Sequence, residues 1–97
     1  MMYVENLIEA RCLFGMRIKI LRKSRRLTQE QLGFMVGISR TRISRLEAGQ
    51  SNIRVDTILL LACALGVTPS DLLAGIDLSE GLDSDSLPIS LGFSKRR

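Results

Sequence analysis

The fold is decided by the stretch from Leu27 to Arg40, which reads Leu-Thr-Gln-Glu-Gln-Leu-Gly-Phe-Met-Val-Gly-Ile-Ser-Arg. Thr28 followed three residues later by Gln31 is a capping box, in which each side chain bonds the other residue's backbone amide and so starts a helix. Gly37 can take the left-handed conformation that ends a helix at little cost. Ser39 is a good N-cap for a further helix. The stretch therefore predicts two short helices joined by a tight turn.

Further helices are predicted on both sides of this pair. The apolar positions expected to face the core are Phe14, Ile18 and Leu21, widened by Met16 and Ile20, and then Val55, Ile58, Leu59, Ala62 and Leu65. Their spacing is helical, and it predicts helices over about 14–25 and 55–65. The second of these is apolar nearly all round, so it is buried on most sides or meets a partner, and Cys63 is expected in the core. Thr68, Pro69 and Asp71 predict a short last helix that ends at Gly75.

The two ends of the chain are read differently. Residues 1–13 fit either a short helical extension or a frayed leader, and both readings stay open. From residue 76 to 97 the composition turns to Asp, Ser, Gly and Glu and ends in the basic cluster 95–97, which predicts a flexible tail. Within it, 89–93 would form a short strand if it found a partner. The predicted fold is therefore all-α, with a compact five-helix domain over 14–75.

Composition narrows the class of function. The 97 residues suffice for one small domain, with 45% hydrophobic residues, no His and two Cys. Without His or a close Cys pair, no metal site or cofactor is expected. The absence of a glycine-rich phosphate loop also argues against an enzyme. No apolar run reaches the roughly 18 residues of a membrane span, and no signal peptide is evident, so a cytoplasmic protein is expected.

Charge is strongly segregated along the chain. Residues 11–54 hold eleven Lys and Arg against two acids, whereas residues 55–94 hold six acids and no base. A basic half can neutralise phosphates and release their counterions. The first helix, which carries many of these bases, is therefore expected to approach a phosphate backbone.

The helix that begins at residue 40 carries the candidate base-reading residues. Because Ile43 and Leu46 would face the core, the opposite side presents Arg40, Thr41, Ser44 and Arg45. In a helix-turn-helix, the second helix enters the major groove by its N-terminal end. A guanidinium can bond guanine O6 and N7 together, and a threonine methyl can contact thymine. The candidate backbone contacts are Gln29, Arg42, Asn52 and Arg54.

These motifs, together with 43–49 (Ile-Ser-Arg-Leu-Glu-Ala-Gly) and 64–67 (Ala-Leu-Gly-Val), resemble the Cro/CI-type, phage lambda repressor-like helix-turn-helix family, also called the XRE family. The resemblance covers about Phe14 to Gly75. It implies that Gln29 binds phosphate and sets register, and that Arg22 and Glu47 form a salt bridge between the first helix and the reading helix. The family often opens its fourth helix with Ser or Pro, whereas Arg54-Val55 stands here, so a weak cap is expected.

The expected function is a sequence-specific double-stranded DNA-binding transcriptional regulator, a repressor that acts as a homodimer on a palindromic operator. One reading helix contacts only a few base pairs, so two copies are needed. The candidate dimer residues are Val67, Leu72, Leu73 and Ile76. The alternative is an antitoxin or protein-interaction module whose C-terminal tail binds a partner protein. A neutral or acidic reading helix would favour an interaction module that has lost DNA binding, and this one is rich in arginine.

Overall fold

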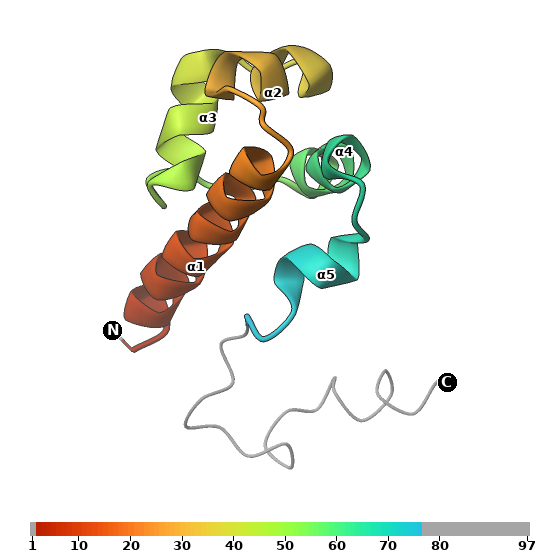
Figure 1. The fold of residues 1–97 in the computed structure, drawn as a ribbon. Coiled ribbons are helices and arrows are strands. Elements are labelled where there is room, and N and C mark those ends of the chain that lie inside the picture. The colour runs from red at the N-terminus through yellow and green to blue at the C-terminus, as the bar shows by residue number, and fades with distance from the viewer. Residues whose placement is uncertain (1, 77–97) are drawn as a thin grey trace.

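The computed structural model describes residues 2–76, and these form five helices without a strand among them (Figure 1). The helices are α1 (Met2–Ser24), α2 (Gln29–Val36), α3 (Arg40–Glu47), α4 (Val55–Leu65) and α5 (Pro69–Leu73). The predicted all-α class and the five-helix count are both confirmed. The tail predicted from residue 76 onward, including the segment 89–93, lies outside the described residues except for Ile76. No helix among those described combines the length and the apolar character that a membrane crossing requires.

The first helix begins much earlier than the predicted residue 14. α1 runs without a break from Met2, so residues 2–13 form a helical extension. Ala10 and Leu7 stand one and two turns ahead of Phe14, and the three line one groove. Ala10 is half-buried and Leu7 is exposed, so the apolar stripe of α1 continues toward its N-terminus with decreasing burial. Neither glycine nor proline occurs among residues 2–13, so no helix-breaking residue interrupts this extension.

The predicted caps are present. The Thr28 hydroxyl accepts a hydrogen bond from the Gln31 amide at 3.0 Å, and Gln31 Oε1 accepts one from the Thr28 amide at 2.8 Å. Gly37 ends α2 with φ of 73°. The Ser39 hydroxyl accepts from the Arg42 amide at 3.2 Å and starts α3. The turn between α2 and α3 is therefore built from the residues that the sequence indicated.

The last two helices differ in how they begin. At α4 the side chain of Arg54 makes no capping hydrogen bond, in line with the weak cap expected there. At α5, Thr68 and Asp71 form a second capping box with both bonds at 3.0 Å. The pKa of the Asp71 carboxyl lies below its ordinary value of 3.8. The hydrogen bond from the Thr68 backbone amide lowers it most, and the Thr68 hydroxyl lowers it further.

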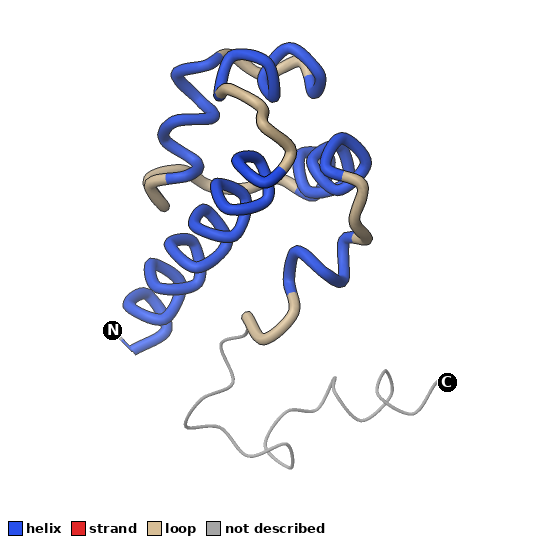
Figure 2. The backbone as a smooth tube through the Cα atoms, viewed as in Figure 1, coloured by secondary structure: helices blue, strands red, loops and turns tan. Residues whose placement is uncertain are grey.

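The core lies between the five helices, where α1 packs against α3, α4 and α5, and α2 packs against α3 and α4. Figure 2 shows how the helices are arranged around it. Its buried apolar residues are Phe14, Ile18, Leu32, Val36, Ile43, Leu46, Leu61, Ala62, Leu65 and Leu72. Six of these residues were expected inside from the sequence, namely Phe14, Ile18, Ile43, Leu46, Ala62 and Leu65, and each of the five helices contributes at least one buried residue. The helix-turn-helix is thus supported by α1, which packs on α3, and by α4, which packs on α2, while α5 packs on both supporting helices.

Two predicted core stripes are shifted around their helices. Met16 and Ile20, expected to widen the α1 stripe, are exposed. On α4, Val55 and Leu59 were expected inside and are exposed as well, and the buried face is centred on Leu61. Because nearly every position of α4 is apolar, the sequence pattern did not fix which side turns inward.

Cys63 was expected in the core and is exposed. It lies eight residues after Val55 and four after Leu59, on the outward side of α4. The position of Cys63 on the helix therefore outweighs the usual preference of a small apolar side chain for burial.

Candidate nucleic-acid interface

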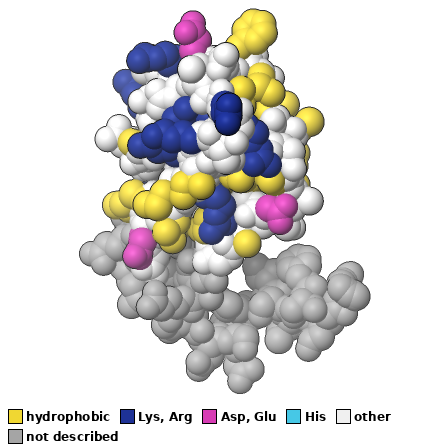
Figure 3. Space-filling model, in the orientation of Figure 1, with side chains coloured by type: hydrophobic (Ala, Val, Ile, Leu, Met, Phe, Trp, Pro, Cys, Tyr) yellow, Lys and Arg dark blue, Asp and Glu magenta, His cyan; other side chains and the backbone are white. Residues whose placement is uncertain are grey.

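The outward face of α3 carries all four predicted base-reading residues. Arg40, Thr41, Ser44 and Arg45 are exposed, and so is Arg42. Ile43 and Leu46 are buried and hold the opposite side of the helix against the core. In the view of Figure 3, Lys and Arg side chains are spread over the upper half of the molecule, where α2, α3 and the end of α1 lie in Figure 1. This face is cationic, polar and backed by a rigid core.

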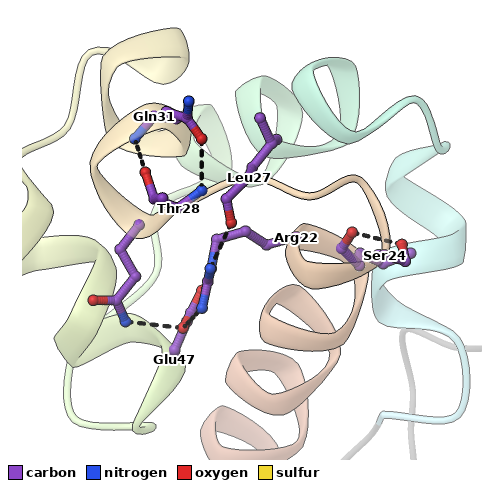
Figure 4. A network of polar contacts seen from close by, with 8 residues as sticks. Arg22, Ser24, Leu27, Thr28, Gln31 and Glu47 are labelled. Atoms are coloured by element: carbon purple, nitrogen blue, oxygen red, sulfur yellow. Dashed lines mark hydrogen bonds and ion pairs between the residues drawn. The ribbon is translucent and has the colours of Figure 1, made fainter.

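The ion pair expected between α1 and the end of α3 is present. The Arg22 guanidinium donates from Nε to Glu47 Oε2 at 2.6 Å and from Nη2 to Glu47 Oε1 at 3.1 Å. Arg22 also donates from Nη1 to the Leu27 carbonyl at 2.6 Å, just ahead of the α2 cap (Figure 4). The two charged side chains are buried. Such a pair fixes orientation more than it adds net stability, but removing one partner would leave a buried charge.

Gln29 is the first residue of α2 and is half-buried. Its side-chain amide Nε2 donates to Glu47 Oε1 at 3.0 Å. The predicted backbone-contact residue and the predicted salt bridge therefore belong to one network, a connection that the sequence did not reveal.

Two arginines of the α1 region tie helices together. Arg17 Nη1 donates to the carbonyls of Asp71, Leu72 and Ala74 at the end of α5, at 3.3, 3.0 and 2.7 Å. Arg25 Nε donates to the Leu65 carbonyl at the end of α4 at 2.8 Å. Cations placed at helix C-termini also complement the helix dipole.

The loop after α3 holds the other two predicted backbone contacts. Asn52 and Arg54 are both exposed. The Asn52 Oδ1 accepts a hydrogen bond from Arg11 of α1, so this loop is anchored to the first helix. Arg11 thus fixes the loop that follows the reading helix.

The four predicted dimer residues do not share one surface. Leu72 is fully buried in the core, so it is not available for an interface. Leu73 and Ile76 line a groove of about 350 Å³, which we call the α4–α5 groove. Its other lining residues are Ile58 of α4, Asn52 and Ile53 of the preceding loop, and Leu7, Ala10, Arg11 and Phe14 of α1. Val67 lies in a second groove of about 360 Å³, which we call the α1–α5 groove, together with Leu13, Met16 and Ile20.

Comparison with known proteins agrees with this geometry. Residues 18–72 match the family described as Helix-turn-helix. The control protein C.BamHI of Bacillus amyloliquefaciens is 42% identical over 64 residues, which are 65% of this chain and 79% of that protein. The crystal structure of the restriction-modification controller protein C.AhdI from Aeromonas hydrophila is 39% identical, with a TM-score of 0.61, over 63% of this chain and 92% of that one.

A third relative is a repressor. The P22 c2 repressor, in a crystal structure with a synthetic operator, is 37% identical with a TM-score of 0.60, over 64% of this chain and 94% of that one. Against the whole repressor protein C2 of Salmonella phage P22, the match of 40% over 68 residues spans 31% of its length. The chain belongs to the helix-turn-helix family of the Cro/CI type, and it is a DNA-binding transcriptional regulator.

Proposed function

We propose that the chain is a repressor that binds double-stranded DNA as a homodimer, with α3 of each copy in the major groove of one half-site. The observation that carries the proposal is the exposed face of α3, where two arginines, a threonine and a serine stand opposite a buried Ile43 and Leu46. Side chains held on a rigid helix can match the fixed donor and acceptor pattern of base edges.

In this proposal Arg40, Thr41, Ser44 and Arg45 read bases. The backbone contacts come from Gln29 at the start of α2, from Arg42, and from the loop with Asn52 and Arg54. These groups surround α3 and would hold its angle in the groove, while contributing the salt-dependent part of the affinity.

The second copy would contact this one through the α4–α5 groove. The groove is lined mostly by apolar side chains, and Leu73 on its rim is 41% exposed. Burying exposed apolar surface favours association by about 25 cal/mol per Å². A two-fold dimer would place two α3 helices on half-sites about one turn of DNA apart, about 34 Å.

The test is a selection of bound sequences from a pool of random DNA duplexes. A two-fold symmetric consensus with half-sites about ten base pairs apart is the expected result. Recovery of sequences without a consensus would contradict sequence-specific binding. A single, unrepeated half-site would contradict the dimer and leave the reading face in place.

A further inference from the structure

The polar network behind α3 joins the backbone-contact residue to the reading helix. Glu47, the last residue of α3, accepts hydrogen bonds from Gln29 at 3.0 Å and from Arg22 at 2.6 and 3.1 Å. We propose that Glu47 is a positioning residue for DNA binding, whose carboxylate orients the Gln29 side chain toward the phosphate backbone. The inference rests on the proposed role of Gln29.

The chemistry of the two groups sets the orientation. A carboxylate only accepts hydrogen bonds, so it draws the Nε2 end of the Gln29 carboxamide and repels the Oε1 end. A phosphate also only accepts. The Nε2 group carries two hydrogens, and the one not given to Glu47 remains for a phosphate oxygen. Without Glu47, the Gln29 carboxamide would no longer be held in one orientation, and its Nε2 group would be less well placed to bind a phosphate.

Burial and charge make the arrangement rigid. The Glu47 side chain is 3% exposed and that of Arg22 is 8% exposed. Glu47 therefore does not itself reach a ligand on the surface, and it acts through Gln29. Arg22 neutralises the carboxylate, which would otherwise repel a nearby phosphate, and its third nitrogen is fixed by the Leu27 carbonyl at 2.6 Å.

Because Glu47 ends α3 and Gln29 starts α2, one carboxylate couples the two helices that meet the DNA. The Glu47 carboxylate thereby fixes the position of the Gln29 side chain relative to the base-reading helix. A pre-organised contact loses less conformational freedom on binding than a mobile one. The coupling should therefore appear as a dependence of the Gln29 contribution on Glu47.

The experiment is a double-mutant cycle on affinity for the selected duplex. Gln29→Ala is made in the natural chain and in a chain with Arg22→Met and Glu47→Leu, an apolar pair that avoids leaving a buried charge unpaired. We expect Gln29→Ala to weaken binding about tenfold in the first background and less than about threefold in the second. Equal losses in both backgrounds would overturn the positioning role alone. No loss on Gln29→Ala in the natural chain would overturn both the positioning role and the backbone contact of Gln29, whereas absence of binding by the natural chain would overturn the proposed function.

A readout without DNA separates positioning from a merely structural role. The side-chain amide protons of Gln29 are followed by NMR, with those of Gln31 as the control, because Gln31 bonds the Thr28 amide through its oxygen. In the Arg22→Met, Glu47→Leu chain, the Gln29 signals should move toward those of a solvated glutamine while the Gln31 signals stay in place. Unchanged Gln29 signals in a folded variant would overturn the proposal.

Discussion

Gly15 of α1 lies directly against the backbone carbonyl of Leu46 in α3. A Cβ atom on Gly15 would stand 2.2 Å from that oxygen, a separation that real Cβ atoms essentially never show. Backbone lies on both sides of this contact, so neither side can yield by rotating a side chain. The glycine therefore sets how closely the reading helix packs on α1.

Gly15→Ala should destabilise the fold by about 1–3 kcal/mol, the usual cost of overpacking. Helix propensity alone predicts the opposite sign, a gain of about 1 kcal/mol for alanine over glycine inside a helix. The measurement is chemical denaturation followed by circular dichroism. The control is Met16→Ala on the exposed neighbour, which should change the free energy of unfolding by no more than about 0.5 kcal/mol. A Gly15→Ala variant as stable as the natural chain would contradict the close contact.

Arg17→Met should loosen α5 while leaving the face of α3 intact. The change removes three hydrogen bonds to carbonyls at the end of α5 and keeps most of the apolar stem. Partly exposed bonds of this kind should contribute about 1–2 kcal/mol in total. Hydrogen exchange of the α5 amides measures the effect. Lys19→Met, an exposed change on the same helix, is the control, and faster exchange in both variants would argue against a specific tether.

The helix ends were predictable because they depend on short-range chemistry. Thr28, Gly37, Ser39 and Thr68 each act within three or four residues of the helix boundary that they form, and all four do so in the structure. The outward face of α3 was predictable for a similar reason, because Ile43 and Leu46 fix the phase of an otherwise polar helix.

The rest depended on contacts between distant segments. Arg17 meets carbonyls more than fifty residues away, and nothing in the pattern of α1 distinguishes it from Lys19. The sequence could not show which side of α4 is buried, because almost every residue of this helix is apolar. Packing against the other helices determines the buried side. The bond between Gln29 and Glu47 joins the start of one helix to the end of the next, and such pairs are invisible to periodicity.

Acid should weaken the α5 cap through Asp71. Its pKa is lowered in the folded chain by bonds to the Thr68 amide and hydroxyl, so the ionised form is favoured on folding. The stability that it contributes is present above the ordinary pKa of 3.8 and is lost as the pH falls through the lowered value. In thermal unfolding, Asp71→Asn should therefore be less stable than the natural chain at neutral pH, and the difference should shrink below about pH 4. A constant difference across that range would exclude this carboxylate as its source.

Arg45→Ala should relax discrimination at one or two base pairs of the operator, by about 1–3 kcal/mol each. Its guanidinium is exposed on the reading face and has no backbone role in this proposal. Gln29→Ala, as the matched comparison, should weaken binding by a similar factor on all sequences. Affinities for a panel of single-base operator variants measure both. If the two substitutions gave the same sequence-independent loss, the division into base reading and backbone contact would be wrong.

Leu73→Glu should convert the proposed homodimer into a monomer. A charge placed on the rim of the α4–α5 groove would have to be desolvated in the dimer, while in the monomer it stays in water because Leu73 is 41% exposed. The matched control is Leu13→Glu, which is 45% exposed and lines the α1–α5 groove. Sedimentation at micromolar concentration, with and without operator, should show dimers for the natural chain and for Leu13→Glu, and monomers for Leu73→Glu. Monomers for Leu13→Glu and dimers for Leu73→Glu would move the interface to the groove that contains Val67.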